Sequence, residues 1–250
     1  YGIRADRVTR GFFDSVTPGS TNSTEGCDGI ASSPVFSTLS CTFTNAFALT
    51  LSTTGGGTIR YTTNGTAPNE SSAAYGAPIP IPASTRVRAR VYEALKVPSP
   101  VVTHVYLKLA ADLWSFSSDL PMVVIDNFGA GVPPADDPMQ QAYMIVFDRA
   151  GGRAYVTNGA VLDARIAIKK HGSSTANQPK WNLRFSVYDE DDTEKDVSLL
   201  DMPSDSDWYL YAACLDNTGG TFDFDRTFMR NPFVYELSNE TGRYAARTRF

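Results

Sequence analysis

The sequence predicts a mainly β protein of the α+β class, with a β-sandwich followed by a domain that mixes strands and a helix. Residues 1–110 are dense in Ser, Thr, Gly and Pro, and their short runs alternate between apolar and polar positions. Residues 111–250 contain further strand patterns and one convincing helix pattern. The 250 residues are enough for two domains of ordinary size, each with its own core.

Four alternating runs define the first domain. Residues 47–52 alternate at period two, and residues 58–63 do the same before Asn64-Gly65, a pair suited to a turn with positive φ. Residues 86–92 place three Arg on one face of a strand and apolar side chains on the other. Residues 101–107 form the expected last strand. Several short strands at this spacing favour a sandwich.

The second domain begins after a linker at about residues 110–120. Residues 120–126 are a continuous apolar run, which predicts a strand buried on both faces or at a domain interface. Three further alternating strands and one aromatic, buried strand are expected. They cover residues 141–148, 164–169, 181–189 and 207–215.

One helix is predicted, over residues 228–240. Phe228, Phe233, Val234 and Leu237 can share one broad face, and Gly242 is placed to end the helix.

Charge and composition exclude several classes of partner and site. The net charge is −5 and the basic residues are scattered, so neither nucleic acid nor anionic lipid is an expected partner. No run of eighteen apolar residues is present, so no membrane span is expected. The only two His residues lie far apart in sequence, which gives no support to a His-based metal site or triad. The acidic residues at 189–192 and 205–207 suit turns better than cation binding, so no metal site is predicted.

Sequons and cysteines indicate an extracellular setting. Asn22, Asn64, Asn69 and Asn239 each open an Asn-x-Ser/Thr sequon and are predicted glycosylation sites. A Cys27–Cys41 disulfide would close a loop of about 15 residues, worth roughly 3 kcal/mol, and the alternative is two free thiols. Cys214 lies in an apolar stretch and is expected to be buried. Because the chain begins at Tyr1, it is expected to be a processed or excerpted segment.

The first domain resembles the small immunoglobulin-like module found at the end of chitobiases and beta-hexosaminidases. The resemblance rests on residues 59–68 (IRYTTNGTAP), 75–79 (YGAPI), 86–89 (RVRA) and 98–103 (PSPVVT). The module's usual Asp at the turn is Asn64 here, which creates that sequon. The resemblance implies a spacer or a weakly carbohydrate-associated domain without catalytic residues.

The same resemblance predicts an insertion. Residues 10–14 (RGFFD) resemble the module's first strand, and its usual continuation comes only at residues 46–47. The first domain is therefore expected to span residues 1–110 as an Ig-like β-sandwich with an insertion at about 15–45. That insertion would carry Cys27, Cys41 and Asn22.

Residues 111–250 resemble the N-terminal part of the spore-coat protein H (CotH) kinase-like family. Four blocks occur in the family's order: residues 169–174 (KKHGSS), 179–180 (PK), 197–208 (VSLLDMPSDSDW) and 229–232 (MRNP). His171 stands where the family commonly has Arg. The family's catalytic acidic residues lie beyond the point that Phe250 reaches, so the resemblance implies a truncated CotH-like α+β domain.

In kinases, a strand Lys paired with a helix Glu orients the nucleotide phosphates. The resemblance makes Lys180 and Glu236 the candidates for these roles, with ATP and Mg²⁺ as cofactors under that reading only. Alternatively they are a surface Lys and a helix-face Glu. The segment 171–174 is either an anion-binding turn or a plain Gly turn between strands. Without the family's acidic residues, the chain is not expected to be a competent kinase by itself.

Three functions follow from these observations. The leading hypothesis is an extracellular glycosylated structural protein, such as a surface, coat or filament subunit, that self-associates or binds other extracellular proteins and needs no cofactor. The second is an atypical secretory-pathway kinase whose catalytic half lies outside this chain. The third is a carbohydrate-binding module, although Tyr61, Tyr75, Tyr92 and Tyr106 occupy positions typical of core residues.

Overall fold

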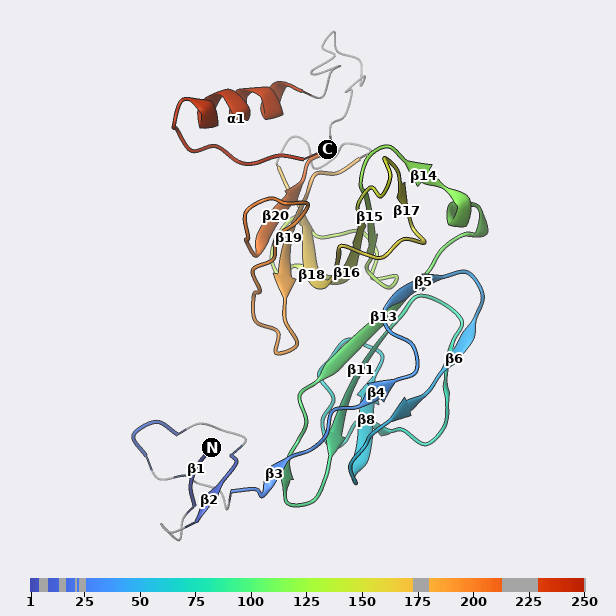
Figure 1. Ribbon diagram of the computed structural model, residues 1–250, viewed down its shortest axis with the longest axis vertical. Helices are drawn as coiled ribbons and strands as arrows, with labels where there is room; N and C mark the ends of the chain where they lie inside the picture. Colours follow the sequence, from blue (N-terminus) through green and yellow to red (C-terminus); the bar gives the residue numbers. More distant parts are fainter. Residues whose placement is uncertain are drawn as a thin grey trace. The chain divides into compact units, whose positions relative to one another are not determined.

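The computed structural model describes residues 1–4, 9–13, 17–20, 22, 26–172, 180–212 and 229–249. The chain divides into two compact units, Tyr1–Ala110 and Ala111–Phe250 (Figure 1). The described residues are mainly β, with one α-helix among them, which confirms the predicted fold class. None of the described helices is long and apolar enough to cross a membrane.

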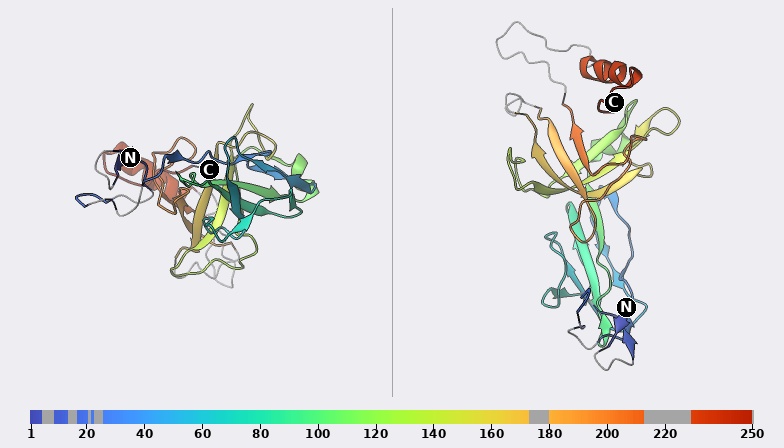
Figure 2. Two further views of the ribbon diagram at one scale, coloured as in Figure 1. Left: turned by 90° about the horizontal axis from the view of Figure 1, so that it is seen from below. Right: turned by 90° about the vertical axis from the view of Figure 1, so that its left-hand side faces the viewer.

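The first unit is built on a five-stranded sheet of order β5-β13-β11-β8-β9. Its two longest strands, β11 and β13, lie side by side in both views of Figure 2. Val87, Ala89 and Val91 of β11 are buried, and they alternate with three Arg residues as the sequence predicts. The strands of this sheet are β5 (Cys41–Phe43), β8 (Thr58–Thr62), β9 (Ala73–Ala74), β11 (Thr85–Tyr92) and β13 (Val102–Lys108).

A second layer closes the sandwich. It consists of two antiparallel pairs, β4 with β7 and β6 with β10. Side chains from both layers share one core, in which Leu49, Ile81 and Val87 are fully buried. The strands of this layer are β4 (Val35–Phe36), β6 (Phe47–Leu49), β7 (Leu51–Ser52) and β10 (Ile79–Ile81).

Part of the predicted insertion at residues 15–45 packs with the sandwich. Strands β3 (Gly29–Ile30) and β12 (Lys96–Val97) pair in parallel, and Ala31, Phe36 and Phe43 are buried in the sandwich core. The chain from Gly29 onward therefore belongs to the sandwich. The N-terminal strands β1 (Gly2–Ile3) and β2 (Arg10–Gly11) pair with each other, so Arg10 does not open the sandwich as its resemblance suggested.

The predicted Cys27–Cys41 disulfide is not formed, and both residues are free thiols. The chain beside Cys27 bonds to Leu95, just beyond the end of β11, through the Asp28 N–H (2.8 Å). Cys41 pairs with Tyr106, which lies opposite Thr85 at the start of β11. The eight residues of β11 span about 25 Å at 3.3 Å per residue, far beyond the Cα separation that a disulfide allows. The other cysteine, Cys214, lies outside the described residues.

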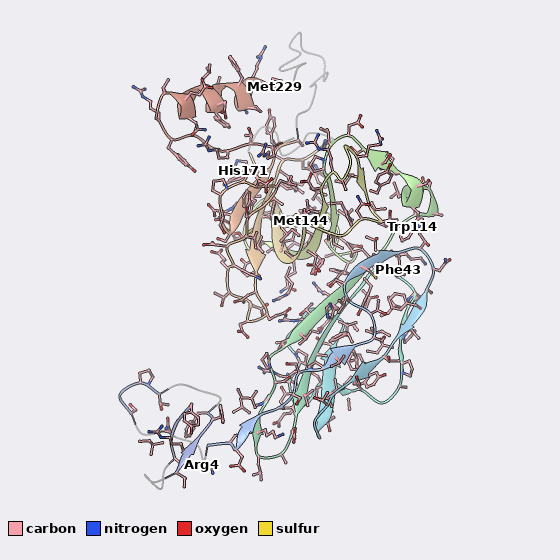
Figure 3. All side chains as sticks on the ribbon, viewed as in Figure 1. Arg4, Phe43, Trp114, Met144, His171 and Met229 are labelled. Atoms are coloured by element: carbon pink, nitrogen blue, oxygen red, sulfur yellow. The ribbon has the colours of Figure 1, made fainter. Side chains whose placement is uncertain are left out.

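The second unit contains an antiparallel sheet of order β15-β16-β18-β19-β20. Alternate side chains of its strands form one core, in which Met144 and Phe185 are fully buried (Figure 3). The strands are β15 (Met122–Asp126), β16 (Gln140–Phe147), β18 (Leu162–Lys170), β19 (Leu183–Tyr188) and β20 (Asp207–Leu210). A short 3₁₀ helix, η1 (Ala111–Ser115), precedes a two-stranded pair of β14 (Ser117–Ser118) and β17 (Ala154–Tyr155).

The apolar run at residues 120–126 is an edge strand and not a strand buried on both faces. Within the described residues, β15 pairs only with β16. The side chain of Leu120 is 54% exposed and that of Val123 is 37% exposed. A continuous apolar pattern predicted burial here, but such a pattern cannot distinguish a central strand from an edge strand.

The one α-helix among the described residues, α1 (Arg230–Glu240), falls within the predicted range and ends where the sequence placed its stop. Gly242 adopts φ +77°, and its N–H bonds to the Asn239 carbonyl oxygen at 3.0 Å. The Arg243 N–H bonds to the Ser238 carbonyl oxygen, also at 3.0 Å. These two bonds are the pattern of a Schellman motif, which needs a residue that tolerates positive φ. Phe228 of the predicted apolar face lies outside the described residues.

Candidate functional site

Two of the four sequons lie in one loop between β8 and β9, here called the sequon loop (residues 63–72). Asn64 Oδ1 accepts hydrogen bonds from the Thr66 N–H (3.1 Å) and the Thr66 hydroxyl (2.8 Å). Asn69 Oδ1 accepts the same pair of bonds from Ser71, at 2.9 and 2.6 Å. Each asparagine therefore closes a turn on the hydroxyl residue of its own sequon. Both asparagine residues are exposed.

Strands β8 and β11 hold the sequon loop through four side chains that donate to its main-chain carbonyl groups. The donor pairs are Arg60 to Ser72 (3.0 Å), Arg86 to Asn64 (2.5 Å), Arg88 to Gly65 (2.9 Å) and Tyr92 to Pro68 (3.0 Å). Gly65 has φ +91°, and a Cβ there would lie 2.3 Å from Arg86 Cζ. The sequence indicated the Asn64-Gly65 turn and the row of Arg. It did not indicate that these Arg side chains donate hydrogen bonds to the carbonyl groups of that turn.

In the other two sequons, the asparagine side chains form hydrogen bonds with other parts of the chain. Asn239 Oδ1 accepts from the Ala245 N–H at 3.2 Å, and its Nδ2 is buried with no hydrogen-bond partner in the described part of the chain. Asn22 Nδ2 donates to the Ile3 carbonyl oxygen at 2.7 Å, and its Oδ1 accepts from the Thr17 hydroxyl at 2.8 Å.

In the second unit, residues of the first and third CotH-like blocks lie where β18, β19 and β20 meet. Lys169 pairs with Asp137 at 3.0 Å, and Arg184 pairs with Asp207 at 2.7 Å. The His171 ring lies 4.5 Å from that of Tyr209, and the chain turns at Gly172 with φ +96°. His171 is exposed and its N–H donates to the Asn182 carbonyl oxygen at 2.8 Å. Ser173, Ser174 and Pro179 lie outside the described residues.

Asp207 is held by its own sheet. Its carboxylate accepts from Arg184 and from the Ser186 hydroxyl. Burial raises the pKa of Asp207, but the bonds from Ser186 and Arg184 outweigh this, so its pKa lies below the ordinary value. The same contact raises the pKa of Arg184.

The acidic stretches form turns. Asp189 Oδ1 accepts from the N–H groups of Asp191 and Thr193, both at 2.9 Å. The bond from Thr193 is the main cause that lowers the pKa of Asp189. Asp205 Oδ1 accepts from the Asp207 N–H at 3.0 Å. These are the side chain-to-backbone bonds that the turn interpretation predicts.

The candidate nucleotide-binding pair is not joined in the described residues. Lys180 is exposed and precedes β19 by three residues, and Glu236 is exposed on α1. No ion pair links them within the part of the chain that the structure describes. Their pairing remains a prediction.

The helix α1 exposes its apolar side chains and buries none of its residues. Phe233 is 60% exposed and Val234 is 59% exposed. With Leu237, also exposed, they follow the spacing of one helix face.

Three of the four Tyr residues considered for sugar binding lie in or against the sandwich core. Tyr106 is fully buried, and Tyr61 and Tyr75 pack against the same core. Tyr92 is anchored to the sequon loop through its hydroxyl group. These four side chains therefore do not form an exposed aromatic row of the kind that stacks on sugars.

Two family models match parts of the chain. The model described as "Fn3 associated" matches residues 48–106, and the model described as "CotH kinase protein" matches residues 168–250. Both resemblances inferred from the sequence are thereby confirmed, with an Fn3/Ig-like module followed by a partial CotH region. No curated protein matches the chain.

Proposed function

We propose that this chain is an extracellular, glycosylated structural protein, a subunit or segment of a surface, coat or filament that acts through protein–protein contacts. The observation that carries this proposal is α1, an 11-residue helix with no buried residue. A helix this short is marginal in water by itself and normally depends on packing of an apolar face. Phe233, Val234 and Leu237 offer that face to a partner surface.

The sequon loop supports the extracellular part of the proposal. Its two asparagine residues are exposed, and four side chains of the sheet hold its main chain in place. Glycans on Asn64 and Asn69 would extend from this loop without displacing a core contact. The match to a spore-coat-associated family is compatible with a surface location.

The kinase reading remains the second candidate because the matching family model is described as a kinase. It assigns nucleotide binding to Lys180 and Glu236, with ATP and Mg²⁺. Phosphoryl transfer also needs a base and a carboxylate on the metal ion. We assign neither of these two roles to a residue described here.

The test is the intact mass of the natively isolated protein, before and after enzymatic deglycosylation, together with its state of assembly. Loss of glycan mass and assembly into high-order particles are the expected results. An unglycosylated monomer would overturn the proposal.

A further inference from the structure

We propose that β15 is a self-association edge, which pairs antiparallel with β15 of a second copy across a two-fold axis at Val124. This inference rests on the proposed function, because it names one contact through which the subunit would assemble. Its starting point is the position of β15 at the end of the five-stranded sheet. An edge strand presents unpaired N–H and C=O groups to any strand that can dock there.

The composition of β15 lacks the devices that usually protect an edge. Its five residues read MVVID, with no Lys, Arg or Pro among them. Other edges in the described residues are blunted: β9 has two residues, β5 has three, and β10 contains Pro80. At the opposite edge of the same sheet, Asp207 of β20 is bound by Arg184. Among these edges, β15 is the longest, and all of its residues except Asp126 are apolar.

The exposure of this strand conflicts with its sequence. An uninterrupted apolar run is typical of a strand covered on both sides, yet no residue of β15 is fully buried: Val123 is exposed, as is the preceding Leu120, and the other four residues of the strand are half-buried. Sequences usually agree with their folds at every level, so incomplete burial of such a run points to a missing contact. A strand of another molecule would supply this contact by pairing with β15 at the edge of the sheet.

The sequence of β15 is complementary to itself in the antiparallel direction. With Val124 opposite Val124 of the second copy, Val123 faces Ile125, and Met122 faces Asp126. No two charges meet in this register, and both faces of the pair stay largely apolar. A parallel, in-register pair would instead place two Asp126 carboxylates side by side. The antiparallel pair is also isologous, so one contact closes a two-fold dimer.

Cysteine cross-linking of the full chain tests the register. In a background with Cys27, Cys41 and Cys214 changed to Ser, Val124→Cys is expected to form a disulfide-linked dimer under mild oxidation. Directly opposed residues lie about 4.5–5.5 Å apart between Cα atoms, within the range of a disulfide. Val123→Cys alone is not expected to cross-link, because its two copies lie diagonally at about 7–8 Å. A mixture of Val123→Cys with Ile125→Cys should cross-link.

A second variant tests the edge without cysteines. Val123→Lys places a charge opposite Ile125 of the other copy, and we expect self-association in sedimentation velocity to weaken about tenfold or more. Val123→Thr is the matched control and should associate like the native chain, with both variants folded by circular dichroism. If Val124→Cys stays monomeric and Val123→Lys associates normally, β15 pairing is overturned. Assembly of the native protein in that case leaves the proposed function standing, whereas a monomeric native protein overturns both.

Discussion

The guanidinium group of Arg88 is completely buried, and its Nη1 donates to the carbonyl oxygen of Gly65 at 2.9 Å. Replacing Arg88 with Ala would leave a cavity in the first unit and a carbonyl group without this donor. We expect Arg88→Ala to lower the free energy of unfolding by about 2–4 kcal/mol. Urea unfolding followed by circular dichroism measures the loss. Arg10→Ala, at an exposed position, is the control and should change stability by less than about 0.5 kcal/mol.

Two adjacent glycines before β8 offer a matched pair of substitutions. Gly57 has φ +113°, and a Cβ there would lie 2.5 Å from the Tyr92 carbonyl oxygen. At Gly56 the nearest atom to an added Cβ is 3.7 Å away. Gly57→Ala is therefore expected to cost about 2–4 kcal/mol, whereas Gly56→Ala should cost less than about 1 kcal/mol. Equal melting temperatures for the two variants would contradict the backbone geometry assigned here.

Local patterns in the sequence predicted local structure well. The alternation around Val87, the turn at Asn64-Gly65 and the helix stop at Gly242 all depend on a few neighbouring residues, and each lies where it was expected. Period-two alternation and positive-φ turns have physical causes that act within the local segment.

Contacts between distant segments were not predictable in the same way. The spacing of Cys27 and Cys41 suggested a disulfide, but Asp28 beside Cys27 bonds to Leu95, just beyond the end of β11, whereas Cys41 pairs with Tyr106, which lies opposite the start of β11. The ion pair between Arg184 and Asp207 joins residues of two adjacent strands that are 23 positions apart in sequence, and no local pattern predicted it. The apolar run around Val124 indicated burial, but strand order, which the pattern does not contain, places it at an edge.

The ion pair of Arg184 and Asp207 should make the second unit sensitive to acid. The pKa of Asp207 lies below the ordinary value of 3.8. The ion pair therefore stabilises the folded state fully above pH 3.8, and this stabilisation is lost as the pH falls through the lower pKa of the folded state. Asp207→Asn is expected to cost about 0.5–1 kcal/mol at pH 7, because water screens this partly exposed pair. The difference from the native chain should shrink in unfolding experiments as the pH is lowered below 3.8 and through the folded pKa. A constant difference at every pH would contradict this account.

Glycan occupancy should differ among the four sequons. Asn64→Gln and Asn69→Gln are each expected to remove one glycan from the mass of the secreted protein, because both side chains are exposed. Asn239→Gln should leave the mass nearly unchanged, since the Asn239 Nδ2 is buried and a glycan has no room there. Mass spectrometry of the intact variants measures all three. A glycan on Asn239 with none on the sequon loop would reverse the assignment.

ATP and Mg²⁺ discriminate between the structural and kinase readings. A ligand that binds the folded state raises its melting temperature, by an amount that grows with ligand concentration over Kd. Because Lys180 and Glu236 are exposed and no ion pair joins them in the described residues, we expect millimolar ATP with Mg²⁺ to leave the melting temperature unchanged. Lys195→Ala, at another exposed Lys, controls for loss of charge. A rise in melting temperature that Lys180→Ala abolishes and Lys195→Ala preserves would favour nucleotide binding, and the chain would then hold half of a kinase site.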